Sequence, residues 1–458
     1  MTAPQQNVRD VALEALRDRW GNVSAHLERR ADALGLTGSD RALARELSLG
    51  VVRRRRTVWE VLRAFLKDPN RKLPTPLREV LCLGAYQILF LDRVPDFAAV
   101  NEAVAQAIRL RHRRQSGMVN GVLRNIARGA RRHGGAPPLA REVVPVGRGE
   151  YCSLDRPVFA DPAERAAEFL AQAFSLPDEL ATRWLDRAGS LPAAAELAMQ
   201  ANVRPPIVLR VNRLRADVRR VLDSLAAGGA EAHPHANEHS VVLGERANVT
   251  ELAAFRDGWV QPQDPTATAV GLAARPQPGW RVLDLCAAPG TKTTHLAELM
   301  DNHGEIVAAD VSREKIERIE SNCRRLGVSI VRTILAQDVG GLQPESFDLV
   351  LADVPCSNTG VLARRAEARW RFGREQLARL SADQRTLALM AGQFVRPGGR
   401  LVYSTCSIEP EECSEVVAAL RRRLARLTLL DEQLTVPGGG EGLADWHDGG
   451  YYAILENR

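Results

Sequence analysis

The chain has 458 residues, of which 45% are hydrophobic and 26% are charged, a composition typical of a soluble globular protein. This length predicts two to four domains, because one domain usually holds about 100 to 200 residues. The longest apolar stretch, residues 81–91, is too short to cross a bilayer, so no membrane partner is expected. The first residues lack the order of an export signal, which predicts a cytoplasmic protein.

The seven cysteines are odd in number, and no two of them have the C-x-x-C spacing. This pattern argues against a disulfide framework and against a zinc site. We therefore expect free thiols and no bound metal.

Positive charge is concentrated at the N-terminus. Residues 1–135 hold 25 Lys and Arg against 13 Asp and Glu, a net charge of +12, whereas the whole chain carries +6. A basic region of this kind favours a polyanionic partner, most simply a nucleic acid. A solvated helical surface remains the alternative reading.

Residues 1–135 are predicted to form an all-α domain. Apolar residues recur three and four apart in five segments: 8–20, 41–66, 75–91, 98–110 and 117–127.

Residues 136–165 are predicted to be a linker, since the stretch from 131 is rich in Gly, Pro and Arg. Residues 166–260 are predicted to form a small α/β (RRM-like) subdomain, in which helical and strand patterns follow in this order: helix 178–189, strand 207–214, helix 216–229 and strand 240–245.

Residues 261–458 are predicted to form a doubly wound α/β domain with a mostly parallel sheet. Apolar runs of strand length alternate with helical segments such as 312–327 and 374–395. In such folds ligands bind beyond the carboxyl ends of the strands. Each run ends at a polar residue, which places five polar residues at one edge: Asp284, Asp310, Asp338, Asp353 and Thr405.

The loop after the first of these strands, CAAPGTK (286–292), has residues that let its backbone come close to a ligand. Its small residues and Gly290 permit a tight turn before a helix begins. The loop is neither a Walker loop nor G-x-G-x-x-G, so it does not predict phosphate binding. An acidic residue at the position of Asp310 can accept hydrogen bonds from ribose, which favours S-adenosylmethionine; a helix N-cap is the alternative role.

Cys356 and Cys406 each follow the end of a predicted strand, so the fold brings two thiols to one crevice. A thiolate is the nucleophilic form, and at neutral pH it needs a positive neighbour such as Lys292. Either cysteine taken alone is more often a buried packing residue.

Three motifs resemble those of the Sun group of RNA cytosine-5 methyltransferases: DLCAAPGTKT (284–293), ADVPCSNTG (352–360) and STCSIEPEE (404–412). Residues 8–130, with LGAYQILFLDRVPDFAAVNEAV and MVNGVLRNI, are similar to the NusB RNA-binding helical domain. The combination resembles the Sun/RsmB-type methyltransferases of bacterial small-subunit ribosomal RNA over nearly the whole chain.

The resemblance implies a methyltransferase that acts on a cytosine of small-subunit ribosomal RNA, with RNA alone or in an early assembly intermediate as its partner. Cys406 would form a covalent bond to carbon 6, Cys356 would help to release the product, and Asp353 would bind the cytosine edge. We expect a monomer. The cofactor S-adenosylmethionine would be held by ten residues: Cys286, Ala287, Ala288, Pro289, Gly290, Thr291, Lys292, Asp310, Asp338 and Asp353.

Two positions depart from the family pattern: Thr291 replaces a glycine, and Val354 stands where a second proline is usual. Segment 364–372 follows the family only in part, which leaves open whether its residues position the substrate: Arg364, Arg365 and Trp370.

Three other functions are alternatives. A DNA cytosine-5 methyltransferase would use Cys356 as its nucleophile, but this leaves Cys406 and the N-terminal helices unexplained. An RNA-binding factor with a dormant methyltransferase domain would not need both cysteines. An NAD-linked oxidoreductase would need the glycine fingerprint that the chain lacks.

Overall fold

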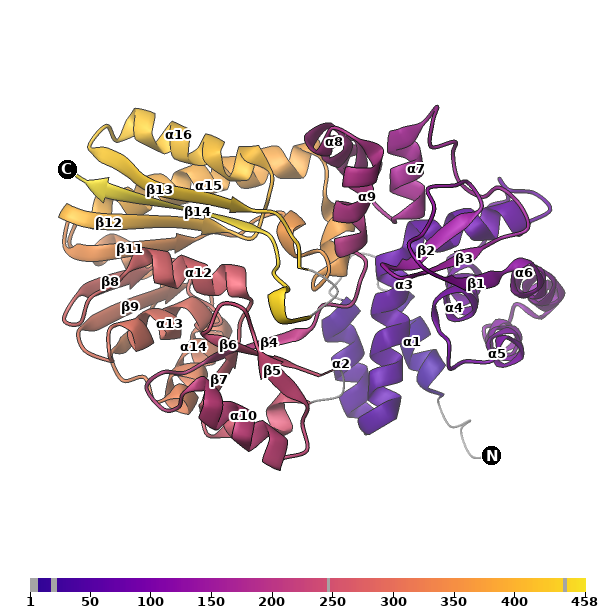
Figure 1. The fold of residues 1–458 in the computed structure, drawn as a ribbon, viewed down its shortest axis with the longest axis horizontal. Helices are drawn as coiled ribbons and strands as arrows, with labels where there is room; N and C mark the ends of the chain where they lie inside the picture. Colours follow the sequence, from indigo (N-terminus) through magenta and orange to yellow (C-terminus); the bar gives the residue numbers. More distant parts are fainter. Residues whose placement is uncertain (1–6, 18–22, 245–247, 440–442) are drawn as a thin grey trace. The chain divides into compact units, whose positions relative to one another are not determined.

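The computed structural model describes residues 7–17, 23–244, 248–439 and 443–458. Contacts divide the chain into two compact units, which Figure 1 colours along the sequence. Unit 1 comprises Met1–Val203 together with Arg365–Gly373, and unit 2 comprises Arg204–Arg364 together with Arg374–Arg458. In the described part of the chain, every helix is too short or too polar to cross a membrane.

The N-terminal part of unit 1 is the predicted helical domain. It contains six α-helices: α1 (Val8–Arg17), α2 (Val23–Ala33), α3 (Gly38–Phe65), α4 (Thr75–Phe90), α5 (Asp96–Arg109) and α6 (Ser116–Gly129). The five predicted helices are all present, and α4 is central because it is buried on nearly every side. Helix α2 was not predicted, since it buries only three residues and its other positions are mostly polar.

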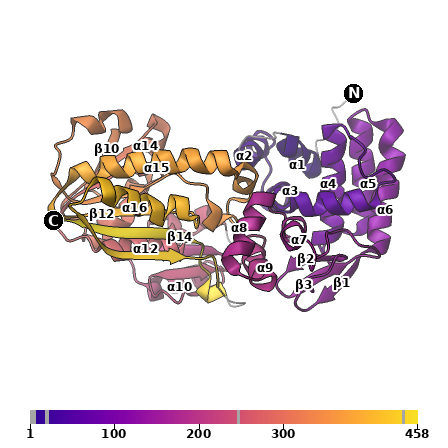
Figure 2. The same ribbon diagram turned by 90° about the horizontal axis from the view of Figure 1, so that it is seen from above.

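The structure corrects the prediction that residues 136–165 form a linker. Three antiparallel strands lie along one side of the α3–α6 bundle (Figure 2), in the order β1-β3-β2. They are β1 (Arg131–Gly134), β2 (Val143–Gly147) and β3 (Glu150–Ser153). The glycines and prolines that suggested a linker lie mostly in the turns, while short apolar strands bury Val143, Val144 and Cys152.

Contacts also place the next three helices in unit 1 rather than in the α/β subdomain predicted from residue 166. They are α7 (Ala166–Ala173), α8 (Asp178–Ala188) and α9 (Leu191–Gln200). They are tied to α3, because the Thr57 hydroxyl donates to the carbonyl of Gln172 at 2.8 Å.

Residues 365–373 complete unit 1, although the sequence around them belongs to unit 2. The guanidinium of Arg369 is fully buried and donates to backbone and side-chain oxygens of four residues outside this segment: Arg53, Ser175, Ala201 and Asn202. The indole of Trp370 donates to the carbonyl of Val52 at 2.8 Å. Trp370 therefore serves the packing of unit 1, which argues against the open possibility that it positions substrate.

Unit 2 begins with the predicted small α/β subdomain. Its antiparallel sheet has the order β5-β6-β4-β7, and two of these strands and helix α10 were predicted. The elements are β4 (Ile207–Val211), α10 (Val218–Ala227), β5 (Ala232–Pro234), β6 (Ser240–Leu243), α11 (Ala253–Arg256) and β7 (Val260–Pro262). Strands β5 and β7 have three residues each, too few for an alternating pattern to be recognised.

The rest of unit 2 is the predicted doubly wound domain, with a seven-stranded sheet in the order β10-β9-β8-β11-β12-β14-β13. The first five strands in that order are parallel, and the last two pair antiparallel. The strands are β8 (Arg281–Asp284), β9 (Glu305–Asp310), β10 (Val331–Leu335), β11 (Phe347–Asp353), β12 (Val395–Thr405), β13 (Leu427–Thr435) and β14 (Gly450–Asn457).

Helices cover both faces of this sheet (Figure 1), and each face has its own hydrophobic core. One face carries α12 (Pro265–Ala274), α13 (Thr291–Leu299) and α14 (Arg313–Leu326). The other carries α15 (Arg374–Phe394) and α16 (Ser414–Arg423). Burial on both sides explains why the parallel strands read as continuous apolar runs in the sequence.

Candidate active site

The carboxyl ends of the central parallel strands meet at one edge of the sheet, as predicted. Strand β11 lies between β8 and β12, so that Leu351 faces Asp284 and Asp353 faces Ser404 in the register. The loops that follow these three strands carry the three motifs, which therefore lie side by side.

The loop 286–292 turns tightly from β8 into α13. Gly290 has φ 92°, and a Cβ there would come within 3.2 Å of the Cα of Ile319. Both facts require glycine at this position. The backbone amide of Ala288 donates to Oδ2 of Asp310 at 2.9 Å, which fixes the loop against the end of β9.

Asp310 is a buried carboxylate held by three donors. Besides Ala288, the amide of Val311 donates to it at 2.7 Å and the ammonium of Lys315 at 2.8 Å. Burial opposes its charge, but these hydrogen bonds outweigh burial and lower the pKa of Asp310. The alternative role as N-cap of α14 is taken by Ser312, whose hydroxyl accepts from the amide of Lys315.

Two other residues predicted to hold the cofactor, Cys286 and Asp338, differ from each other in burial. Burial, followed by the nearby carboxylates of Asp284 and Asp353, raises the pKa of Cys286 to about 12, so its thiol stays protonated and unreactive. Asp338 lies past the end of β10 in a short 3₁₀ helix and is exposed. Its contact with a cofactor stays a prediction.

Lys292 and Asp353 form an ion pair inside the site. The ammonium donates to Oδ2 of Asp353 at 2.7 Å, and the hydroxyl of Ser404 donates to Oδ1 at 2.7 Å. Burial opposes the charge of Lys292, but Asp353 and, more weakly, Cys406 outweigh it and raise the pKa of Lys292. The lysine is therefore charged and interacts electrostatically with Cys406. That it favours the thiolate of Cys406 stays a prediction.

The two motif cysteines are in contact, with 3.0 Å between the sulfur atoms of Cys356 and Cys406. Cys356 is buried, whereas Cys406 is half-buried and lines a pocket. The hydrogen bond to Cys406, together with burial, raises the pKa of Cys356 well above that of an ordinary thiol. Cys406 is thus the sulfur that a ligand can reach, and Cys356 stays protonated behind it.

A buried polar network joins the loops that carry the cysteines. The amide of Gly360 donates to the carbonyl of Cys406 at 3.0 Å, and the amide of Ile408 donates to the hydroxyl of Thr359 at 3.1 Å. Glu412, which is fully buried, accepts from the amide of Ser357 at 2.9 Å and from Gln384 at 2.9 Å. This network fixes both cysteine loops relative to each other.

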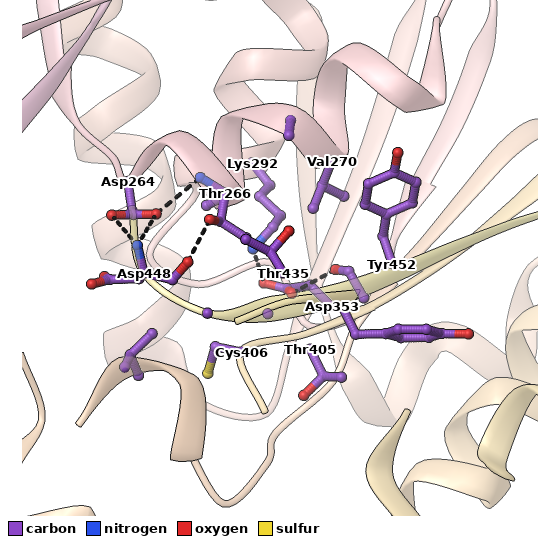
Figure 3. A pocket seen from close by; sticks show the side chains of 17 residues that line it. Asp264, Thr266, Val270, Lys292, Asp353, Thr405, Cys406, Thr435, Asp448 and Tyr452 are labelled. Carbon is purple, nitrogen blue, oxygen red and sulfur yellow. Dashed lines mark hydrogen bonds and ion pairs between the residues drawn. The ribbon is translucent and has the colours of Figure 1, made fainter. Parts of the chain in front are cut away.

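Cys406, Lys292 and Asp353 lie on the wall of a small hollow at this edge of the sheet (Figure 3). Asp264 and Asp448 line the hollow as well, and both accept from the guanidinium of Arg364. The guanidinium of Arg364 is thus paired with two carboxylates, which argues against the open possibility that it positions the substrate. No group of three or more His, Cys, Asp or Glu side chains able to hold a metal occurs among the described residues.

Sequence reasoning missed three side chains that shape this site: Asn358, Ser404 and Glu412. All three lie inside the two cysteine motifs, so membership of a motif was an available signal. Their partners are up to 55 residues away, however, and only the fold shows them.

Comparison with known proteins agrees with this geometry. Residues 271–441 match the family described as 16S rRNA methyltransferase RsmB/F. Residues 6–128 match the NusB family, and residues 176–250 match the ferredoxin-like domain of RsmF/B-like methyltransferases.

The chain is similar to several characterised or solved proteins. The probable ribosomal RNA small subunit methyltransferase B of Bacillus subtilis (strain 168) is 32% identical over 90% of this chain and 88% of its own length. The ribosomal RNA small subunit methyltransferase B of Salmonella newport (strain SL254) is 29% identical over 98% of this chain and 99% of its own. A methyltransferase homologue from Pyrococcus horikoshii is 27% identical, with a TM-score of 0.54 over 64% of this chain and 99% of its own.

One further crystal structure shares the fold over 100% of this chain and 99% of its own, with a TM-score of 0.73 at 23% identity. The family match, the relative at 32% identity and the paired cysteine loops lead to one conclusion. The chain belongs to the RsmB/F family of S-adenosylmethionine-dependent methyltransferases of small-subunit ribosomal RNA.

Proposed function

We propose that this protein methylates carbon 5 of a cytosine in small-subunit ribosomal RNA through a covalent bond between Cys406 and carbon 6. The observation that carries the proposal is the contact between Cys406, which lines the hollow, and the buried Cys356. Carbon 5 is a poor nucleophile, and addition of a thiolate to carbon 6 activates it. S-adenosylmethionine, when bound, supplies the electrophilic methyl group.

Lys292 and Asp353 prepare the first step. The charged ammonium of Lys292 favours the thiolate of Cys406, which forms the bond to carbon 6. Asp353, held at both oxygens by Lys292 and Ser404, would bind the polar edge of the cytosine. Its position beside the nucleophile would also stabilise positive charge on the adduct.

The cofactor would be held by the loop 286–292 together with Asp310, Asp338 and Asp353. The loop has the tight turn at Gly290 and the anchor at Asp310 that close approach of an adenosine-type ligand needs. The residues present therefore fit the cofactor that the family uses.

Cys356 serves the last step. After methyl transfer, carbon 5 gives its proton to a base such as a solvent water molecule, the electron pair of that C–H bond re-forms the double bond between carbons 5 and 6, and the bond between carbon 6 and sulfur breaks, so that Cys406 leaves as a thiolate. The raised pKa of Cys356 keeps its S–H in place, and this S–H can donate to the departing sulfur. Without that donor, the adduct would persist.

Recognition of RNA would begin at the N-terminal helices. Residues 1–135 carry a net charge of +12, and residues 6–128 match the NusB family. Phosphate contacts from such a surface supply affinity without sequence specificity. We propose small-subunit ribosomal RNA, alone or in an early assembly intermediate, as the partner.

The test is denaturing gel electrophoresis after incubation with S-adenosylmethionine and unmodified small-subunit ribosomal RNA. We expect a protein–RNA band that resists denaturation for Cys356→Ala, none for Cys406→Ala, and no methyl transfer by Cys406→Ala. Cys323→Ala is the control, because this thiol is buried on α14 away from the site. A resistant band for Cys406→Ala alone would mean that the two cysteines have the opposite roles. If no sample gave a band and wild type transferred no methyl group, an RNA-binding factor would be the remaining function.

A further inference from the structure

Asn358 bridges the two cysteines of the site. Its side-chain amide donates from Nδ2 to the backbone carbonyl of Cys356 at 2.8 Å, and its Oδ1 accepts from the sulfur of Cys406 at 3.3 Å. The residue is half-buried and lies within the loop that carries Cys356. It therefore touches both sulfur-bearing residues without being a nucleophile or a charged group.

The orientation of this amide follows from its partners. The carbonyl of Cys356 can only accept a hydrogen bond, so the NH₂ group of Asn358 must face it. The oxygen of the amide must then face Cys406, where it can only accept. A flipped amide would set two acceptors against each other at 2.8 Å.

This orientation fixes the direction of the other hydrogen bonds. A thiol has one proton, and that of Cys406 is directed to Oδ1 of Asn358. The contact of 3.0 Å between the sulfurs then needs the proton of Cys356. The result is a ring in which Cys356 donates to Cys406, Cys406 donates to Asn358, and Asn358 donates back to the Cys356 carbonyl.

We propose that Asn358 is a positioning residue that holds the sulfur of Cys406 at the pocket and favours its protonated form before substrate binds. An acceptor hydrogen-bonded to an S–H stabilises the neutral thiol, and the same oxygen repels a thiolate. Asn358 thus opposes the effect of Lys292 and keeps the nucleophile from reacting without RNA. The proposal rests on Cys406 being the nucleophile of the proposed function.

The backbone of Asn358 allows a clean test. Its φ of 64° lies in the left-handed region, which glycine adopts without strain, so Asn358→Gly removes the bridge and keeps the loop conformation. Asn358→Asp keeps the size of the side chain and sets a negative charge beside the sulfur. Asn302→Gly is the matched control, because Asn302 also has positive φ (57°) and bonds Ser329 through its side chain at 3.0 Å.

The experiment measures the rate at which iodoacetamide alkylates Cys406 as a function of pH, with the labelled peptide quantified by mass spectrometry. For Asn358→Gly we expect the pH midpoint to fall by about one unit, and for Asn358→Asp we expect it to rise by a similar amount. Asn302→Gly should match wild type. Circular dichroism confirms folding, and if the glycine variant does not fold, the aspartate variant alone decides.

Unchanged midpoints in the folded Asn358 variants, or a fall in the aspartate variant, would overturn the positioning role. This outcome is separate from the fate of the proposed function, since alkylation needs neither RNA nor S-adenosylmethionine. Failure of wild type to methylate RNA would remove the proposed function and leave the alkylation result intact.

Discussion

Lys292, in the first turn of α13, meets Asp353, the last residue of β11, at the sheet edge, and 2.7 Å separates the ammonium of Lys292 from Oδ2 of Asp353. Ser404 takes the other carboxylate oxygen, so the position of Asp353 depends on two partners from two different motifs. The charge of Lys292 therefore orients a carboxylate, and in the proposed function it also favours the thiolate of Cys406.

Replacing Lys292 with methionine keeps most of its volume and removes the charge. We expect methyl transfer at saturating substrate to fall by about 100-fold or more, because both the thiolate and the orientation of Asp353 are lost. Single-turnover assays with radiolabelled S-adenosylmethionine measure this. Arg318→Met is the control, since Arg318 pairs with Glu314 on the exposed surface of α14; equal activity of both variants would contradict the role of Lys292.

Asp310→Asn should weaken cofactor binding. The amide of Ala288 and the ammonium of Lys315 both donate to this carboxylate, so the change loosens the cofactor loop as well as the expected ribose contact. We expect the dissociation constant of S-adenosylmethionine to rise by about tenfold or more. Isothermal titration calorimetry without RNA measures it, and Glu305→Gln, at the other end of β9, should bind as wild type does.

Glu412→Gln should disturb the loop of Cys356. Glu412 accepts from the Ser357 amide and from Gln384 with Oε1 and from the Ser357 hydroxyl with Oε2, so an amide in its place removes the negative charge from these buried hydrogen bonds and replaces the acceptor of the Ser357 hydroxyl by an NH₂ donor. We expect a loss of about 1 to 3 kcal/mol in the free energy of unfolding, measured by urea denaturation. Glu415→Gln, on the exposed first turn of α16, is the control, and a Glu412 variant as stable as this control would show that the network contributes little.

Asp284 predicts a pH dependence of stability. Burial raises its pKa to about 7 in the folded protein, above its ordinary value of 3.8, while Thr293 donates to one oxygen. Between these two pKa values the folded state therefore binds more protons than the unfolded state. The contribution of Asp284 to the free energy of unfolding is fully present below pH 4 and is lost as the pH rises to about 7.

Asp284→Asn removes this titration. The free energy of unfolding of the variant minus that of wild type should increase from pH 5 to pH 7, by roughly 2 kcal/mol at most. Urea denaturation of both proteins at the two pH values measures the difference. A constant difference between wild type and variant would show that Asp284 does not titrate in this range.

Much of this fold follows from periodicity. Four of the five parallel strands, β8, β9, β11 and β12, are largely buried and read as apolar runs, and the long N-terminal helices have apolar residues three and four apart. Strand β5 and helix α2 bury too few residues to leave a pattern, and the Gly-rich and Pro-rich turns around β2 concealed a sheet.

The site was predictable to the extent that its residues lie in motifs at strand ends. Cys356, Cys406, Lys292 and Asp353 meet because neighbouring parallel strands end at one edge. The partners of Asn358 and Glu412 depend on how loops after different strands fold against each other, which spacing along the chain does not encode.

The buried guanidinium of Arg369 has a consequence for biosynthesis. Domains generally fold as units while the chain leaves the ribosome, N-terminal first. Unit 1 cannot finish folding before unit 2 begins to be made, because its residues 365–373 emerge only after residues 204–364 of unit 2. Its last hydrogen bonds, from Arg369 and Trp370, form when translation is four-fifths complete, so the first unit to be made is among the last to be finished.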